Sequence, residues 1–133
     1  MRLFIAVDIP TEVKKHLTYL QQQLSSQDLS LTKDFHITLK FLGEVNPDKI
    51  EHLKSNLEHI HFEPFKLQLD KVGFFPGEKF VRVVWVGLKN ASKLLWLQKQ
   101  VDLAVGLQYP VDHKFSPHIT LARVKFNRGE FNP

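Results

Sequence analysis

Residues 36–39 read His-Ile-Thr-Leu, and residues 118–121 repeat the same four residues. Both copies are rich in β-branched and apolar side chains, which is typical of a β-strand. Because side chains alternate between the two faces of a strand, His and Thr share one face while Ile and Leu share the other. We therefore predict two strands that each bury an apolar face and leave an imidazole and a hydroxyl on the opposite face.

The same order of predicted elements leads to each copy. A strand, a helix, a connection and the His-Thr strand fill residues 3–42, and the same order fills residues 80–126. This repeat predicts a duplicated α+β fold with a pseudo-twofold axis, which places the two motifs symmetrically across a groove. Only the first half continues with a helix and a strand, over residues 46–75. We therefore expect the second sheet to have an exposed edge that pairs with another copy of the chain.

Apolar periodicity, capping residues and glycines predict the individual elements. Asn46 and Asn90 are the expected N-caps of the second and third helices, and Gly106 is the expected end of the third. The expected strands cover residues 3–9, 29–32, 36–43, 65–75, 80–88 and 118–126, and the expected helices cover residues 11–24, 47–60 and 91–105.

The composition is that of a folded, basic domain. For a chain of 133 residues we expect one domain, over residues 1–133, made of two small lobes that share a core. The chain has no cysteine, which excludes disulfides and thiolate metal sites, and its net charge of +4 favours a polyanionic partner such as RNA. The apolar run from Leu3 to Val7 is too short for a signal peptide or a membrane span, so we expect a cytoplasmic protein with no membrane partner.

Two imidazoles beside one reacting group can divide acid and base catalysis between them. A neutral imidazole accepts a proton from water or a hydroxyl, while a protonated one donates a proton to the leaving oxygen. The hydroxyls of Thr38 and Thr120 can donate hydrogen bonds to the non-bridging oxygens of a phosphate held between His36 and His118. This arrangement favours transfer at a phosphodiester with neither a metal nor a covalent intermediate.

Two cations follow the motifs and are candidate phosphate ligands. In a regular strand Lys40 shares the face of His36 and Thr38, so we expect it to add positive charge to the site. Arg123 falls on the face opposite to His118 and contacts the phosphate only if a bulge or twist turns it inward.

At these residues the chain resembles the 2H phosphoesterase superfamily, which is named for its two His-x-Thr motifs. Within it, the chain is most similar to the LigT-like RNA 2′,3′-cyclic phosphodiesterases, also called 2′-5′ RNA ligases. The resemblance covers nearly the whole chain in the expected order. It rests on the stretches Arg2 to Asp8, His36 to Gly43, Phe75-Pro76 followed by Arg82 and Trp85, and His118 to Lys125.

The resemblance implies a bilobal α+β fold in which two mostly antiparallel sheets face each other across a central cleft, with helices outside. It implies hydrolysis of a 2′,3′-cyclic phosphate on RNA ends or nucleotides to a 2′-phosphate, without a cofactor. By the same resemblance His36 is the proton donor to the 3′ oxygen and His118 is the base that activates water, an assignment that the residues alone leave open. Family members usually run some tens of residues beyond the position of Pro133, so we expect a truncated second lobe.

Several other residues have both a structural and a functional interpretation. Trp85 and Phe75 are candidates for stacking on a base, whereas Phe41 is expected in the core. His59 and His61 could begin a metal site, but the sequence offers no evident third ligand, so we expect no metal. Two alternative functions stay open: a non-catalytic RNA- or nucleotide-binding module, and a 2H enzyme that acts on a small cyclic nucleotide.

Overall fold

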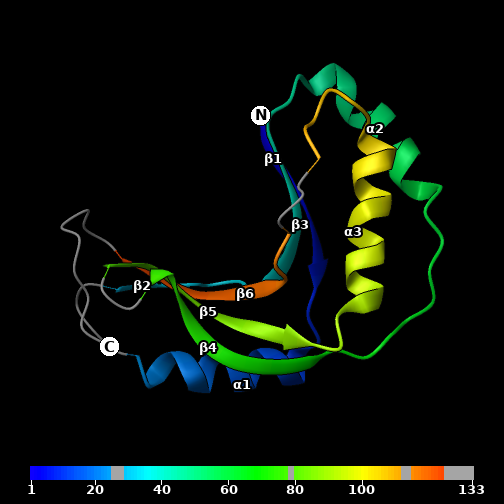
Figure 1. The fold of residues 1–133 in the computed structure, drawn as a ribbon. Coiled ribbons are helices and arrows are strands. Elements are labelled where there is room, and N and C mark those ends of the chain that lie inside the picture. Colours follow the sequence, from blue (N-terminus) through cyan, green and yellow to red (C-terminus); the bar gives the residue numbers. More distant parts are fainter. Residues whose placement is uncertain (25–28, 78–79, 112–114, 125–133) are drawn as a thin grey trace. The chain divides into compact units, whose positions relative to one another are not determined.

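The computed structural model describes residues 1–24, 29–77, 80–111 and 115–124, and Figure 1 draws their helices and strands as a ribbon. The elements are β1 (Arg2–Asp8), α1 (Thr11–Gln22), β2 (Leu29–Leu31), β3 (His36–Glu44), the 3₁₀ turn η1 (Pro47–Lys49), α2 (Ile50–Glu58), β4 (Gln68–Gly77), β5 (Phe80–Lys89), α3 (Ser92–Val105) and β6 (His118–Val124). This order confirms the α+β class and every strand and helix expected from the sequence. Among the described helices, none is long and apolar enough to cross a membrane.

The helix ends follow the predicted capping chemistry at two of three positions. The side chain of Asn46 accepts a hydrogen bond from the backbone N–H of Asp48 at 3.1 Å, and Gly106 ends α3 with a φ of 85°. The expected cap at Asn90 is wrong, because Ala91 precedes α3 and makes no side-chain cap. Asn90 instead adopts a φ of 56°, which asparagine tolerates better than most residues, and its amide donates to Gln68 at 3.1 Å.

The chain forms two compact units, each assembled from three separate segments. Unit 1 contains residues 1–7, 38–68 and 90–117, and unit 2 contains residues 8–37, 69–89 and 118–133. Strand β3 therefore begins in unit 2 and continues in unit 1. This division differs from the order of the sequence repeat, since both units take segments from both halves of the chain.

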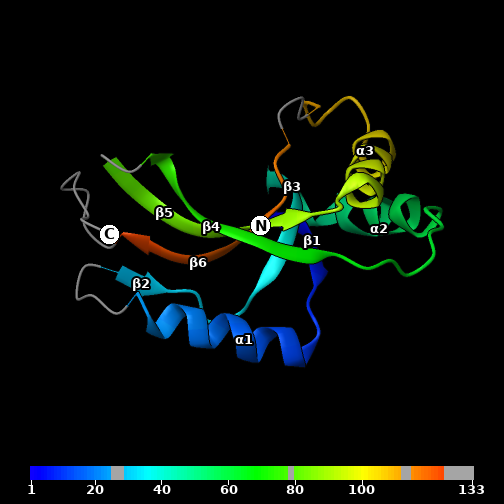
Figure 2. The same cartoon turned by 60° about the horizontal axis from the view of Figure 1, so that its bottom comes forward.

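Unit 2 is a sheet covered on one face by α1. Its strand order is β3-β6-β5-β4, and the short strand β2 also pairs with β6. Figure 2 shows α1 lying along these strands. The side chains buried between helix and sheet are apolar at nearly every position: Leu17 from α1, Val84 and Val86 from β5, and Ile119, Leu121 and Ala122 from β6.

Unit 1 pairs β1 with β3 and packs α2 and α3 on one side of them (Figure 1). Its buried apolar side chains come from all of these elements except β1, and include Leu39, Val45, Leu53, Leu94, Leu97, Val101 and Val105. The helix of the second sequence half, α3, thus packs with the motif strand of the first half, while α1 packs with β6. The two halves of the repeat exchange their helices.

The two motif strands pair directly with each other. Ile37 of β3 is the antiparallel partner of Ile119 of β6, so the two copies are neighbours within one sheet. Strand β6 also has β5 on its other side, so neither side of the second motif strand is an open edge. Periodicity along one strand identifies its faces but contains no information about its partners, so these pairings come from the structure alone. The chain after Val124, to which the expected strand end at residue 126 belongs, lies outside the described residues.

Candidate active site

The site is built on the face of the unit 2 sheet opposite to α1. Ile37 and Ile119, which pair across β3 and β6, are only 4% and 2% exposed on the α1 face. The residues that flank them therefore lie on the other face, and these are His36 on β3 with His118 and Thr120 on β6. His36 and Thr120 are half-buried and His118 is exposed. The sheet thus presents two imidazoles and a hydroxyl from paired strands on one accessible surface.

Thr38 continues the same face of β3, since it stands two residues after His36. It is half-buried and is the first residue of the β3 segment that belongs to unit 1. Strand geometry therefore gives each motif an imidazole and a hydroxyl on one face, as predicted from the tetrapeptide.

The indole of Trp85 lies beside the second motif. Trp85 is paired with Thr120 across β5 and β6, and Gly87 is paired with His118. The rings of Trp85 and His118 have centroids 6.2 Å apart and an interplanar angle of 57°. A β-carbon at Gly73 of β4 would overlap the indole, so glycine at this position leaves the space that the ring occupies. Gly73 is not among the residues singled out from the sequence, although a glycine inside a strand pattern is a known sign of close approach.

A β-bulge brings Arg123 to the same face. Trp85 pairs with Thr120 but the adjacent Val84 pairs with Ala122, so Leu121 is an extra residue in β6. Leu121 and Ala122 are consequently both fully buried, and the alternation of faces shifts by one residue. Arg123, which is exposed, then falls on the face of Thr120. A regular strand would place Arg123 on the opposite face, and the bulge turns it to the face of Thr120.

Lys40 is buried in unit 1. Leu39 and Lys40 are 4% and 6% exposed, so two consecutive residues of β3 are buried, as Leu121 and Ala122 are in β6. The Lys40 ammonium forms an ion pair with Asp102 of α3 and donates a hydrogen bond to the carbonyl of Pro110 at 2.6 Å. With two partners beneath α3, Lys40 acts within the core of unit 1, and we do not include it in the proposed phosphate site.

Phe41 and Phe75 are both exposed, which contradicts the prediction for Phe41 and agrees with the one for Phe75. Phe41 was expected in the core, and this is wrong: its ring is 72% exposed, with the ring of Phe4 at a centroid distance of 6.2 Å. The expectation assumed that burial continues from Leu39 to Phe41, whereas in β3 the buried residues are Leu39 and its neighbour Lys40. Phe75 on β4 is 62% exposed and so remains available to a ligand.

Two charged groups near the first motif, Asp8 and Lys14, have shifted pKa values. The ammonium of Lys14 lies 3.1 Å from Asp8 and 3.2 Å from Asp34. The backbone N–H of Ile9 and the ammonium of Lys14 hold the pKa of Asp8 below its ordinary value, and the charge of His36 lowers it by a smaller amount. The two carboxylates raise the pKa of Lys14. The first histidine therefore lies within electrostatic range of an ionised carboxylate.

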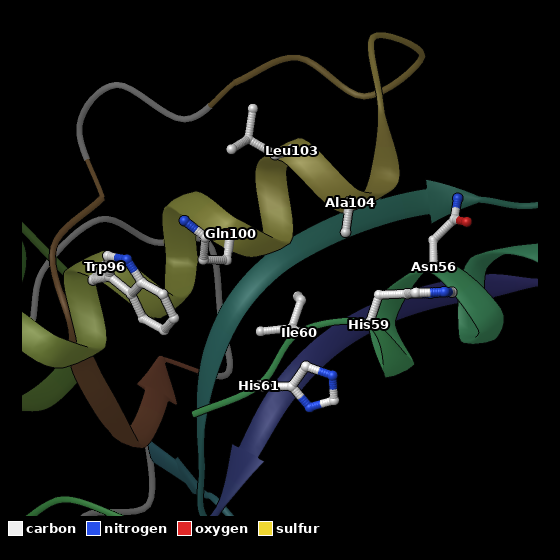
Figure 3. A pocket seen from close by; sticks show the side chains of 8 residues that line it. All are labelled: Asn56, His59, Ile60, His61, Trp96, Gln100, Leu103 and Ala104. Carbon is white, nitrogen blue, oxygen red and sulfur yellow. The ribbon is translucent and has the colours of Figure 1, made fainter. Parts of the chain in front are cut away.

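A separate cavity of about 450 Å³ lies in unit 1 (Figure 3). It is lined by Asn56, His59, Ile60, His61, Trp96, Gln100, Leu103 and Ala104. The Nδ1 atom of His59 lies 2.8 Å from the carbonyl oxygen of Ser55. No group of three or more metal-ligating side chains occurs within the part of the chain that the structure describes, so His59 and His61 have no third ligand there. None of the residues assigned above to phosphate chemistry lines this cavity.

A family model described as LigT like phosphoesterase matches residues 7–85. The RNA 2′,3′-cyclic phosphodiesterase of Methanocaldococcus jannaschii is 36% identical over 129 residues, which are 95% of this chain and 73% of that protein. Among solved structures, one from Thermus thermophilus has a TM-score of 0.86 at 31% identity and covers all of this chain and 79% of its own. Escherichia coli LigT complexed with 3′-AMP has a TM-score of 0.76 at 28% identity, covering 99% of this chain and 76% of its own.

Proposed function

Because the chain belongs to the LigT-like phosphoesterase family, we propose that it hydrolyses RNA-terminal 2′,3′-cyclic phosphates to 2′-phosphates. The observation that carries the proposal is the direct pairing of the two motif strands, which places His36 and His118 on one accessible face. Two imidazoles on one face supply both proton transfers that the reaction needs.

In the proposed reaction, His118 is the base and His36 is the acid. His118 accepts a proton from water as the water oxygen forms its bond to phosphorus. The bond between phosphorus and the 3′ oxygen breaks, and His36 donates a proton to that leaving oxygen. The product is a free 3′ hydroxyl beside a 2′-phosphate, and solvent restores both protonation states. With the 5′ hydroxyl of a second RNA in place of water, the same two groups would break the same bond to the 3′ oxygen and join the two RNAs through a 2′-5′ linkage.

The negative charge that develops on the phosphate is assigned to three donors. Thr38 and Thr120 donate hydroxyl hydrogen bonds to non-bridging oxygens, and Arg123 contributes a guanidinium on the same face of β6 as Thr120. Histidine supplies the acid and the base, so the scheme assigns no step to a metal or a cofactor.

Trp85 is the proposed platform for the base next to the cyclic phosphate. Its indole lies beside His118, at a centroid distance of 6.2 Å, and base–aromatic stacking tolerates any of the four bases. The complex of Escherichia coli LigT with 3′-AMP shows that a relative accepts a nucleotide. Phe75 is a second candidate for stacking, since it is exposed on β4.

The proposal includes a cytoplasmic location, which the lack of cysteine fits. Self-association remains a prediction. If two copies pair through a strand edge, β4 at the end of the strand order provides that edge, whereas β6 has strands on both sides.

The test is incubation with a dinucleotide that ends in a 2′,3′-cyclic phosphate, with and without a chelator, followed by product analysis. We expect a 2′-phosphate product at the same rate in both conditions. Binding without turnover would favour the non-catalytic module, and turnover of mononucleotide cyclic phosphates alone would favour the small-nucleotide enzyme. A 3′-phosphate product, or reversible loss of activity in chelator, would contradict the proposed mechanism.

A further inference from the structure

The leucine carbonyl that ends each motif is held by a buried glutamine. The Nε2 atom of Gln21, on α1, donates to the carbonyl oxygen of Leu121 at 2.8 Å. The Nε2 atom of Gln98, on α3, donates to the carbonyl oxygen of Leu39 at 3.3 Å. These glutamines are only 5% and 2% exposed. The two motifs thus share a contact that the tetrapeptide itself does not contain, and in each case it comes from the helix of the other sequence half.

Gln21 makes its contact at the bulge of β6. Leu121 is the residue that the register with β5 leaves extra, and its carbonyl also accepts a hydrogen bond from the backbone N–H of Thr32 at 2.9 Å. The same Gln21 amide donates to the carbonyl of Thr32 at 2.7 Å. Both of its N–H groups are therefore used, one on the bulge and one on the segment that follows β2, so the amide connects the bulge to its neighbour.

The bulge decides which way Arg123 faces. A strand has a side-chain period of two, so the single extra residue at Leu121 turns Arg123 from the α1 face to the face of Thr120. A bulge interrupts the regular hydrogen-bond ladder, and contacts from outside the ladder then determine its shape. In β6 these contacts come from Gln21 and Thr32.

We propose that Gln21 is a positioning residue for phosphate binding: by holding the Leu121 carbonyl, it fixes the bulge that keeps Arg123 on the catalytic face. This inference rests on the proposed function, because it concerns how the phosphate ligand is oriented. Gln21 lies on the α1 side of the sheet, opposite to the catalytic face, so it acts only through β6.

The arrangement in unit 1 supports this interpretation independently. Gln98 contacts Leu39 at the equivalent position of β3, and the next residue, Lys40, is buried while Phe41 is exposed. Its amide also donates to Asp102 at 3.1 Å, and Asp102 in turn pairs with Lys40. In both strands a buried amide on the leucine carbonyl therefore accompanies two consecutive buried residues, as expected of a contact that belongs to the motif.

The experiment is a double-mutant cycle between Gln21→Met and Arg123→Ala. Methionine has nearly the volume of glutamine but no donor, and Gln22→Met, at the exposed next residue of α1, is the matched control. We measure kcat and KM with the cyclic-phosphate dinucleotide, and the affinity for inorganic phosphate by NMR titration. A circular dichroism melt of each variant confirms that the protein is folded at the assay temperature.

We expect Gln21→Met to weaken phosphate affinity and to lower kcat/KM by roughly tenfold, within the range of coupled neighbours, while Gln22→Met stays within about twofold of wild type. We also expect Arg123→Ala to cost less in the Gln21→Met background than in wild type. Additive effects of the two substitutions, or an unchanged phosphate affinity in folded Gln21→Met, would overturn the inference. If Gln21→Met does not fold, Gln21→Asn, whose amide is one methylene short of both carbonyls, replaces it under the same criteria.

Failure of the proposed function gives a different result. A wild-type protein that binds phosphate but turns over no cyclic phosphate would contradict the phosphodiesterase proposal. The double-mutant cycle, measured by the affinity for inorganic phosphate, would still decide whether Gln21 positions Arg123.

Discussion

The two copies of His-Ile-Thr-Leu are identical in sequence, yet they lead to different chemistry at the next two residues. In both strands the residue after the leucine is buried and the one after that is exposed. In β3 the buried position holds Lys40 and the exposed one holds Phe41, whereas in β6 these positions hold Ala122 and Arg123. The order of buried and exposed positions is the same, and the side chains at these positions differ.

The two motifs therefore have different roles at the two residues that follow the tetrapeptide. In β6 the small Ala122 fills the buried position without needing a polar partner, and the exposed position offers a cation beside Thr120. In β3 the buried cation needs Asp102, and the exposed position offers a phenyl ring. Only the second copy therefore adds a guanidinium to the catalytic face, while the first copy adds an ion pair to the core of unit 1.

The largest effect is expected where the two copies are the same. His36→Ala and His118→Ala should each lower kcat by about 10²–10⁴-fold, because each removes one of the two proton transfers. Folding should survive, since His118 is exposed and His36 half-buried. Single-turnover assays with the cyclic-phosphate dinucleotide and a thermal melt of each variant measure both. Near-normal turnover by either folded variant would exclude the division of acid and base between the copies.

The next largest effect concerns stability. It arises because the buried position after the leucine holds a cation in β3, Lys40, and a small apolar residue in β6, Ala122. Lys40→Met leaves the Asp102 carboxylate buried without its cation, which typically costs about 3–5 kcal/mol of unfolding free energy. Lys54→Met is the control, because the Lys54 ammonium is exposed and lies 3.8 Å from Glu51, and such surface pairs contribute about 0–1 kcal/mol.

Urea unfolding followed by circular dichroism measures these differences, and the double variant Lys40→Met/Asp102→Leu should recover most of the loss. The kcat of the folded fraction should stay close to that of wild type. A stable Lys40→Met variant that has lost turnover would instead return Lys40 to the phosphate site.

A third prediction contrasts the exposed residues, Arg123 and Phe41. Arg123→Ala should lower kcat/KM by roughly 10²-fold, the size expected for loss of one charge-stabilising donor, and should weaken inhibition by inorganic phosphate. Phe41→Ala should change kcat/KM by less than about threefold, since a phenyl ring donates no hydrogen bond to a phosphate. Steady-state kinetics with phosphate as inhibitor measures both variants. Equal losses in the two would show that the copies contribute alike.

The sequence alone predicted the elements of this fold and the face on which the histidines lie. Alternation within His-Ile-Thr-Leu is a local property, and both Ile37 and Ile119 are buried as it requires. Hydrophobic stripes and the Asn46 and Gly106 caps are local as well, which explains why the helices were found at their observed positions.

What the sequence could not predict depends on contacts between distant segments. The expectations for Lys40 and Phe41 assumed regular alternation, whereas Lys40 is buried beside Leu39 and pairs with Asp102 of α3, 62 positions away. Gln98 of α3 also donates a hydrogen bond to the Leu39 carbonyl, between residues 59 positions apart. The pairing of β3 with β6 and the exchange of helices between the sequence halves are likewise long-range, so no window of neighbouring residues contains them.

The smallest effect concerns the charges that precede the first copy. The Lys14 ammonium forms ion pairs with Asp8, at the end of β1, and with Asp34, two residues before His36. The pKa of Asp8 is lowered in the folded protein, by the Ile9 N–H and then by Lys14, so its stabilising contribution is present at neutral pH and is lost as the pH falls through that lowered value. The pKa of Lys14 is raised, so its contribution is complete at neutral pH and is lost only as the pH rises through the raised value.

Lys14→Met should therefore lower the melting temperature slightly at neutral pH, and the difference from wild type should shrink as the pH falls through the lowered pKa of Asp8, where this carboxylate takes up a proton. Because these groups are solvent-exposed, added salt should shrink the difference as well. Melting curves across pH for wild type, Lys14→Met and the neighbouring surface control Lys15→Met measure this dependence. A difference that persists unchanged in acid would show that Lys14 stabilises the approach to His36 through the packing of its aliphatic stem rather than through its charge.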